Sequence, residues 1–106
     1  MFKTTKNCKL ATLILSGIDI NELAEKTKEI ISLSRKEAEK RYEASIPTIM
    51  KRETQINKIT RDLLEEKAFF EKIEADYNNI TGYEVDCIKV AIADYLLMNA
   101  NRFEKS

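Results

Sequence analysis

The sequence predicts an all-α fold of three to four helices, dominated by two long antiparallel helices with coiled-coil-like packing. Three observations support this prediction. The 106 residues include only two glycines and one proline, so the chain has few turns and therefore few, long elements. Charged residues form 34% of the chain and alternate in sign, as on solvated helix faces. Apolar residues recur at every seventh position, the spacing of a buried helical row: Tyr42, Ile49, Ile56, Leu63, Phe70 and Tyr77.

A short helix over residues 7–15 opens the single domain, which we expect to span residues 1–106. Asn7 can cap its start and Gly17 can end it. Lysines precede the apolar stretch from Leu10 to Leu15, as they do in an export signal. The stretch is short and no small-residue cleavage site follows it, so we expect an amphipathic helix instead. No other stretch is apolar for the length that spans a bilayer.

The second predicted element is a long helix over residues 20–44. Asp19 is a suitable N-cap, and Glu22 stands at the third helical position, as in a variant of the capping box. Apolar residues then form a stripe that can face a core: Ile20, Leu23, Ile30, Ile31 and Leu33.

Pro47 determines where the second long helix begins. Proline removes a backbone donor and disfavours helical geometry in the residue before it. We expect a break near Ser45, which could cap a new helix over residues 46–79. A single kinked helix from residue 20 to residue 79 is the less favoured alternative.

The last predicted helix covers residues 82–103 and is the most apolar. Thr81 and Glu84 form a capping-box pattern at its start. Its apolar residues extend nearly all round, so neighbouring helices should surround it. Because so short a chain offers few neighbours, we expect a second subunit to cover part of this helix. The alternative is a monomeric four-helix bundle.

The distribution of charge along the chain favours self-association, although the chain has no net charge. Lys and Arg number 18, as do Asp and Glu, so no net charge draws the chain to nucleic acid or membrane. The segment from Lys51 to Arg61 has a local charge of +3, and that from Asp62 to Asp76 has −4. An antiparallel pair of copies would set each basic half against an acidic half. Equally, these charges could simply be solvated.

The residues give little support for catalysis, so we predict no enzyme activity and no cofactor. Without histidine, the chain lacks the common nucleophile and base pairs and the usual di-iron ligands. Cys8 and Cys87 match no zinc pattern, and we expect two reduced thiols in a cytoplasmic protein. Asp86 and Asp94 stand out because they lie in the most apolar helix. Either could face a ligand, although a solvent-facing edge is the more common position.

The function that the sequence favours is non-catalytic binding of a protein partner, as an adaptor or inhibitor, by a chain that also associates with itself. Small helical proteins of this composition occur among secretion-system adaptors and bacteriophage accessory proteins, but no motif selects either class. The expected interface combines aliphatic and aromatic side chains suited to helix contacts. It comprises Phe70, Ile73, Tyr77, Tyr95, Leu97 and Phe103.

The alternative function is capture of an anionic ligand, a nucleotide or nucleic acid. If the two long helices form a hairpin about Pro47, basic residues gather near its turn, with Tyr42 among them to stack on a base. The candidate anion-binding residues are Arg35, Lys36, Lys40, Arg41, Tyr42, Lys51 and Arg52. Nearby glutamates weaken this local potential, so a solvated hairpin end is the simpler interpretation.

Overall fold

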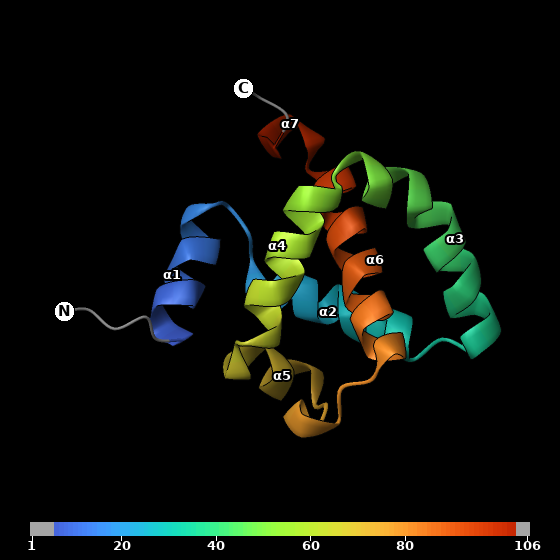
Figure 1. The fold of residues 1–106 in the computed structure, drawn as a ribbon, viewed down its shortest axis with the longest axis horizontal. Coiled ribbons are helices and arrows are strands. Elements are labelled where there is room, and N and C mark those ends of the chain that lie inside the picture. The colour runs from blue at the N-terminus through green and yellow to red at the C-terminus, as the bar shows by residue number, and fades with distance from the viewer. Residues whose placement is uncertain (1–5, 104–106) are drawn as a thin grey trace.

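The computed structural model describes residues 6–103, and these form helices without strands (Figure 1). The side chains of residues 6–9, 11, 78 and 103, and so those of Cys8 and Phe103, lie outside this description. The elements are α1 (Lys6–Leu15), α2 (Ile20–Ile31), α3 (Arg35–Lys51), α4 (Glu53–Leu64), α5 (Lys67–Ile73), the 3-10 helix η1 (Tyr77–Asn79), α6 (Gly82–Met98) and α7 (Ala100–Phe103). The all-helical prediction is confirmed for this part of the chain. None of the helices within it is long and apolar enough to cross a membrane.

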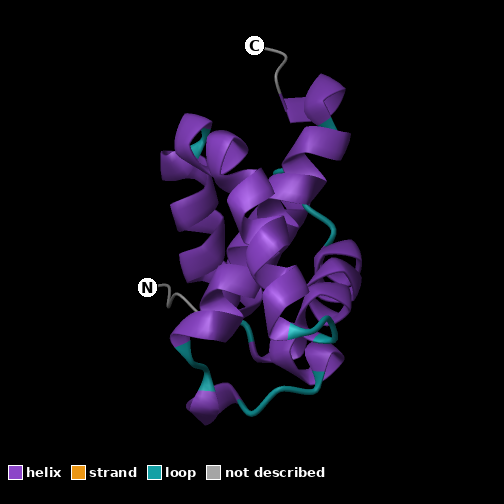
Figure 2. Ribbon diagram, turned by 90° about the vertical axis from the view of Figure 1, so that its right-hand side faces the viewer, coloured by secondary structure: helices purple, strands orange, loops and turns teal. Residues whose placement is uncertain are grey.

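The apolar helix α6 lies at the centre of the fold. Helices α2, α3 and α4 pack against it, so other helices of the same chain surround it on several sides (Figures 1 and 2). Eight of its residues are buried: Cys87, Ile88, Val90, Ala91, Ile92, Ala93, Tyr95 and Leu96. This environment suits a helix that is apolar nearly all round. The buried length of α6 therefore needs no second subunit to cover it.

The first long helix that we predicted is divided between α2 and α3. Helix α2 ends at Ile31, and Ser34 caps α3, its Oγ accepting a hydrogen bond of 3.2 Å from the backbone N–H of Glu37. Ser34 and Glu37 have capping-box spacing, a start signal that lies within a highly charged stretch. The prediction of one helix over residues 20–44 was wrong because it passed over this signal.

Pro47 lies inside α3, so the expected break near Ser45 does not occur. Ser45 does not cap a new helix; its Oγ donates to the carbonyl of Arg41 at 2.9 Å within α3. The break falls instead at Arg52, which lies between α3 and α4. Its φ of −118° and ψ of 32° are not helical. The C-terminal end of α3 curves toward α4 (Figure 1).

The second predicted long helix, over residues 46–79, is divided among α3, α4, α5 and η1. Besides the break at Arg52, one break precedes α5 at Glu66 and another follows it at Glu74, whose φ of 57° is left-handed. The seven-residue row still identifies core positions, because Ile56, Leu63 and Phe70 are almost fully buried. It marks the inner sides of successive short helices rather than one coiled-coil strand.

Local start and stop signals identified several other boundaries correctly. Gly17 follows α1 with a φ of 87°, which glycine adopts without strain. Asp19 caps α2 by accepting a hydrogen bond of 2.8 Å from the backbone N–H of Asn21. Thr81 and Glu84 form the predicted capping box at the start of α6. The last helix ends earlier than expected, at Met98, before the short α7.

Candidate functional site

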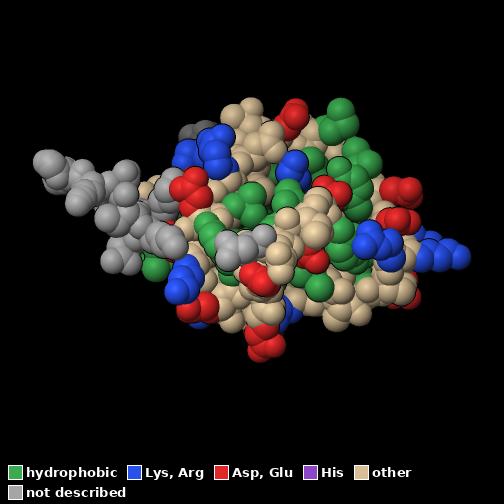
Figure 3. Space-filling model, turned by 60° about the horizontal axis from the view of Figure 1, so that its bottom comes forward, with side chains coloured by type: hydrophobic (Ala, Val, Ile, Leu, Met, Phe, Trp, Pro, Cys, Tyr) green, Lys and Arg blue, Asp and Glu red, His purple; other side chains and the backbone are tan. Residues whose placement is uncertain are grey.

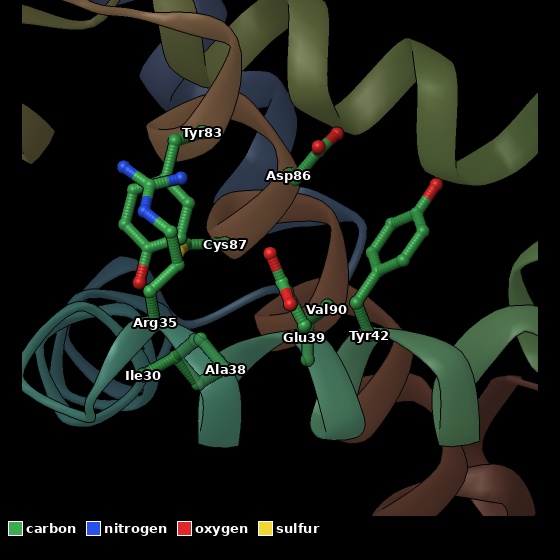
Figure 4. A pocket seen from close by; sticks show the side chains of 9 residues that line it. All are labelled: Ile30, Arg35, Ala38, Glu39, Tyr42, Tyr83, Asp86, Cys87 and Val90. Atoms are coloured by element: carbon green, nitrogen blue, oxygen red, sulfur yellow. The ribbon is translucent and has the colours of Figure 1, made fainter.

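A cleft of about 220 Å³ lies between α3 and the first half of α6 (Figure 4). Its floor is apolar and is formed by Ile30 of α2, Ala38 of α3, and Cys87 and Val90 of α6. The two helices run in the same direction here, because Arg35 meets Tyr83 near their starts and Arg41 meets Asp94 further along. Each helix therefore contributes one row of side chains to a side of the cleft.

One end of the cleft is closed by Arg35 lying over Tyr83. The guanidinium carbon is 4.0 Å from the centre of the Tyr83 ring, which is a cation–π contact (Figure 4). Arg35 begins α3 and Tyr83 lies in the first turn of α6. The contact thus joins the starts of two helices that are far apart in the sequence.

Two carboxylates and a second tyrosine form the rest of the rim. Glu39 and Asp86 are exposed, and Tyr42 is half-buried on the side away from Arg35 (Figure 4). Neither carboxylate makes an ion pair or hydrogen bond with another residue of the described chain. With one cation and two carboxylates, the lining has more negative than positive charge.

The cleft has few groups suited to catalysis. Burial raises the pKa of the Cys87 thiol, which therefore stays protonated and is a poor nucleophile at neutral pH. Within residues 6–103, no group of three or more acidic or thiol side chains could hold a metal ion. The arrangement is suited to binding by shape, stacking and charge.

The structure does not bring the predicted anion-binding residues together. Because α3 continues through Pro47 for 17 residues, it extends over about 25 Å and separates Arg35 from Lys51. Arg41 contacts Asp94 at 3.1 Å and Glu29 at 3.6 Å, so its charge is already balanced. Lys36 and Lys40 are exposed on α3, and Arg52 contacts Gln55 at 3.1 Å. Only Arg35 and Tyr42 of the seven line the cleft.

The predicted interface residues also divide into separate groups. Phe70, Ile73 and Tyr95 are buried in the chain's own core, where a partner cannot reach them. Tyr77 is 40% exposed and packs edge-on against Phe70, with ring centres 5.1 Å apart. Leu97 is 61% exposed near the end of α6. The side chain of Phe103 lies outside the described part of the chain.

Sequence reasoning did not assign Glu39 or Tyr83 to a site and did not connect Asp86 with α3. A signal was nevertheless present in each helix. Arg35, Glu39 and Tyr42 are spaced at i, i+4 and i+7, so they share one face of α3. In α6 the corresponding residues are Tyr83, Asp86, Cys87 and Val90. The spacing identifies each face, but only the packing of α3 on α6 makes the two faces a site.

A larger and more open groove of about 560 Å³ lies beside α1, lined by residues such as Leu10 and Ile14. Two of its polar side chains already serve the fold. Asp19 caps α2, and Arg102 donates a hydrogen bond of 3.0 Å to the carbonyl of Gly17. Charged and apolar side chains also mix on the end of the molecule that α5 and η1 form (Figure 3). We therefore take the α3/α6 cleft, whose carboxylates have no such role, as the candidate site.

No family model, curated protein or solved structure matches this chain.

Proposed function

We propose that this chain is a non-catalytic binding protein that holds a segment of a partner protein in the α3/α6 cleft, as an adaptor or inhibitor. The observation that carries the proposal is the cleft itself, with its apolar floor and its aromatic and charged rim. Its volume of about 220 Å³ is below the range of about 300–1,000 Å³ typical of small-molecule sites. A cleft of this size suits one anchoring side chain of a larger partner better than a whole cofactor.

Capture of an anion has less support. The basic residues are spread along α3, and a phosphate in the cleft would approach Glu39 and Asp86. A cytoplasmic location remains part of the proposal, with Cys87 as a reduced, buried thiol.

A random-peptide display selection against the full chain tests the proposal. Glu39→Trp places an indole at the cleft, whereas Glu37→Trp makes the same change at an exposed position of α3 that does not line it. Peptides selected on the original chain should lose binding to Glu39→Trp and keep it to Glu37→Trp. Equal binding to both variants would place the peptides elsewhere and contradict the proposal.

Self-association is a second candidate function, favoured by the end of α6. Leu97 and Met98 are consecutive large apolar residues exposed at 61% and 72%, and contiguous exposed apolar surface can mark a protein contact. A second copy could cover this end of α6 while leaving its buried length unchanged. Leu97→Lys, which places a charge at this end of α6, tests this candidate function.

A further inference from the structure

The carboxylates of the α3/α6 cleft indicate the charge of its occupant. Glu39 and Asp86 lie on opposite helices at the rim, and neither is neutralised by another residue of the described chain. Arg35, the cation of the lining, lies over the Tyr83 ring and closes one end of the cleft. An incoming cation would therefore find two carboxylates, whereas an incoming anion would be repelled by them.

Tyr42 indicates the shape of that cation. Its ring stands across the cleft from Tyr83, and no cation of the described chain lies over it (Figure 4). Arginine stacks on aromatic faces and donates hydrogen bonds from a planar fork that matches carboxylate oxygens. The Arg35–Tyr83 contact is an example of this stacking within the same cleft.

We infer that the cleft accepts an arginine side chain of the partner protein, with its guanidinium between the Tyr42 ring and the carboxylates of Glu39 and Asp86. The methylene stem of the arginine would lie on the apolar floor formed by Ala38 and Val90. This inference rests on the proposed function and adds the chemistry of the anchoring residue.

Titration of the isotope-labelled full chain with N-acetyl-arginine amide, followed by NMR chemical shifts, tests the inference. The amides of Glu39, Tyr42 and Asp86 should shift and saturate together. N-acetyl-citrulline amide, which is similar in shape but uncharged, should bind more weakly. Each of Glu39→Gln and Asp86→Asn should weaken arginine binding by about twofold to fivefold, as for an exposed ion pair. Glu37→Gln, an exposed change outside the cleft, should leave binding unchanged.

Equal binding of arginine and citrulline would overturn the inference, as would shifts confined to other surfaces. Equal binding of N-acetyl-lysine amide would overturn the choice of a guanidinium. The peptide selection separates these failures from failure of the proposed function. Peptides that need the cleft but lack arginine would refute only the inference, whereas peptides that ignore Glu39→Trp would refute the function as well.

Discussion

The guanidinium of Arg35 lies 4.0 Å from the centre of the Tyr83 ring and joins the first residue of α3 to the first turn of α6. Cation–π contacts at exposed sites contribute about 0.5–1 kcal/mol. This contact also holds one end of the cleft closed, so it links the stability of the fold to the shape of the candidate site.

Arg35→Ala should lower the free energy of unfolding by about 0.5–1 kcal/mol, because it removes the cation from the Tyr83 ring. Tyr83→Leu should lower it as well, and the double variant should lose less than the sum of the two. Urea unfolding of the four proteins gives this double-mutant cycle. Strictly additive losses would show that the contact contributes no coupling energy.

Thr81→Ala should lower the free energy of unfolding by about 1 kcal/mol, because it removes the side-chain cap of α6. The hydrogen bonds from Thr81 hold the pKa of Glu84 below its usual value. Stability from Glu84 is therefore full above its unfolded pKa of about 4.3 and is lost as the pH falls through the lower folded value. Urea unfolding from pH 7 to pH 3 should show a shallower acid loss for Thr81→Ala than for the original chain.

Local signals account for the parts of the fold that the sequence predicted well. The caps at Asp19 and Thr81 depend on residues within one turn, so the pattern alone identifies them. The row containing Ile56 and Leu63 correctly marked core positions because burial follows helical spacing even across short breaks. The left-handed residue Glu74 has no such signal, since glutamate is not a typical helix-ending residue.

The candidate site was less predictable because it depends on packing between distant segments. Arg35 and Tyr42, which both line the cleft, were predicted from the sequence as parts of an anion site. Their surroundings contain Glu39 from the same helix and Asp86 from α6, so the balance of charge is reversed. No pattern within α3 could show that α6 would place a carboxylate beside it.

Tyr95→Phe should lower the free energy of unfolding by about 1–3 kcal/mol, because it removes two part-buried hydrogen bonds that each contribute about 0.5–1.5 kcal/mol. The Tyr95 hydroxyl donates to the carbonyl of Gly17 at 3.0 Å and accepts from the N–H of Asp19 at 3.1 Å. It therefore fixes the turn between α1 and α2 against the central helix. Tyr42→Phe is the matched control, because the Tyr42 hydroxyl makes no hydrogen bond within the described chain. Equal losses for the two variants, measured by urea unfolding, would contradict this role.

Stability should fall as the pH rises above about 8, partly because of Cys87. Burial raises the pKa of the Cys87 thiol, so the folded chain keeps a proton that the unfolded chain releases at about pH 8.5. The contribution is full below that pH and is lost as the pH rises through the folded pKa. Urea unfolding from pH 7 to pH 10 should show this decline, and Cys87→Ala should reduce its slope. An unchanged slope in the variant would assign the decline to other groups.

Leu97→Lys should abolish self-association, because it places a charge among the exposed apolar side chains at the end of α6. The original chain should then show a concentration-dependent dimer in sedimentation at micromolar concentrations, and the variant should remain a monomer. Leu15→Lys is the matched control, since Leu15 is 86% exposed and lies on α1 rather than on α6. Both substitutions are at exposed positions and should change the free energy of unfolding by no more than about 0.5 kcal/mol. A chain that stays monomeric before any substitution would remove self-association as a candidate function and leave the cleft as the site to pursue.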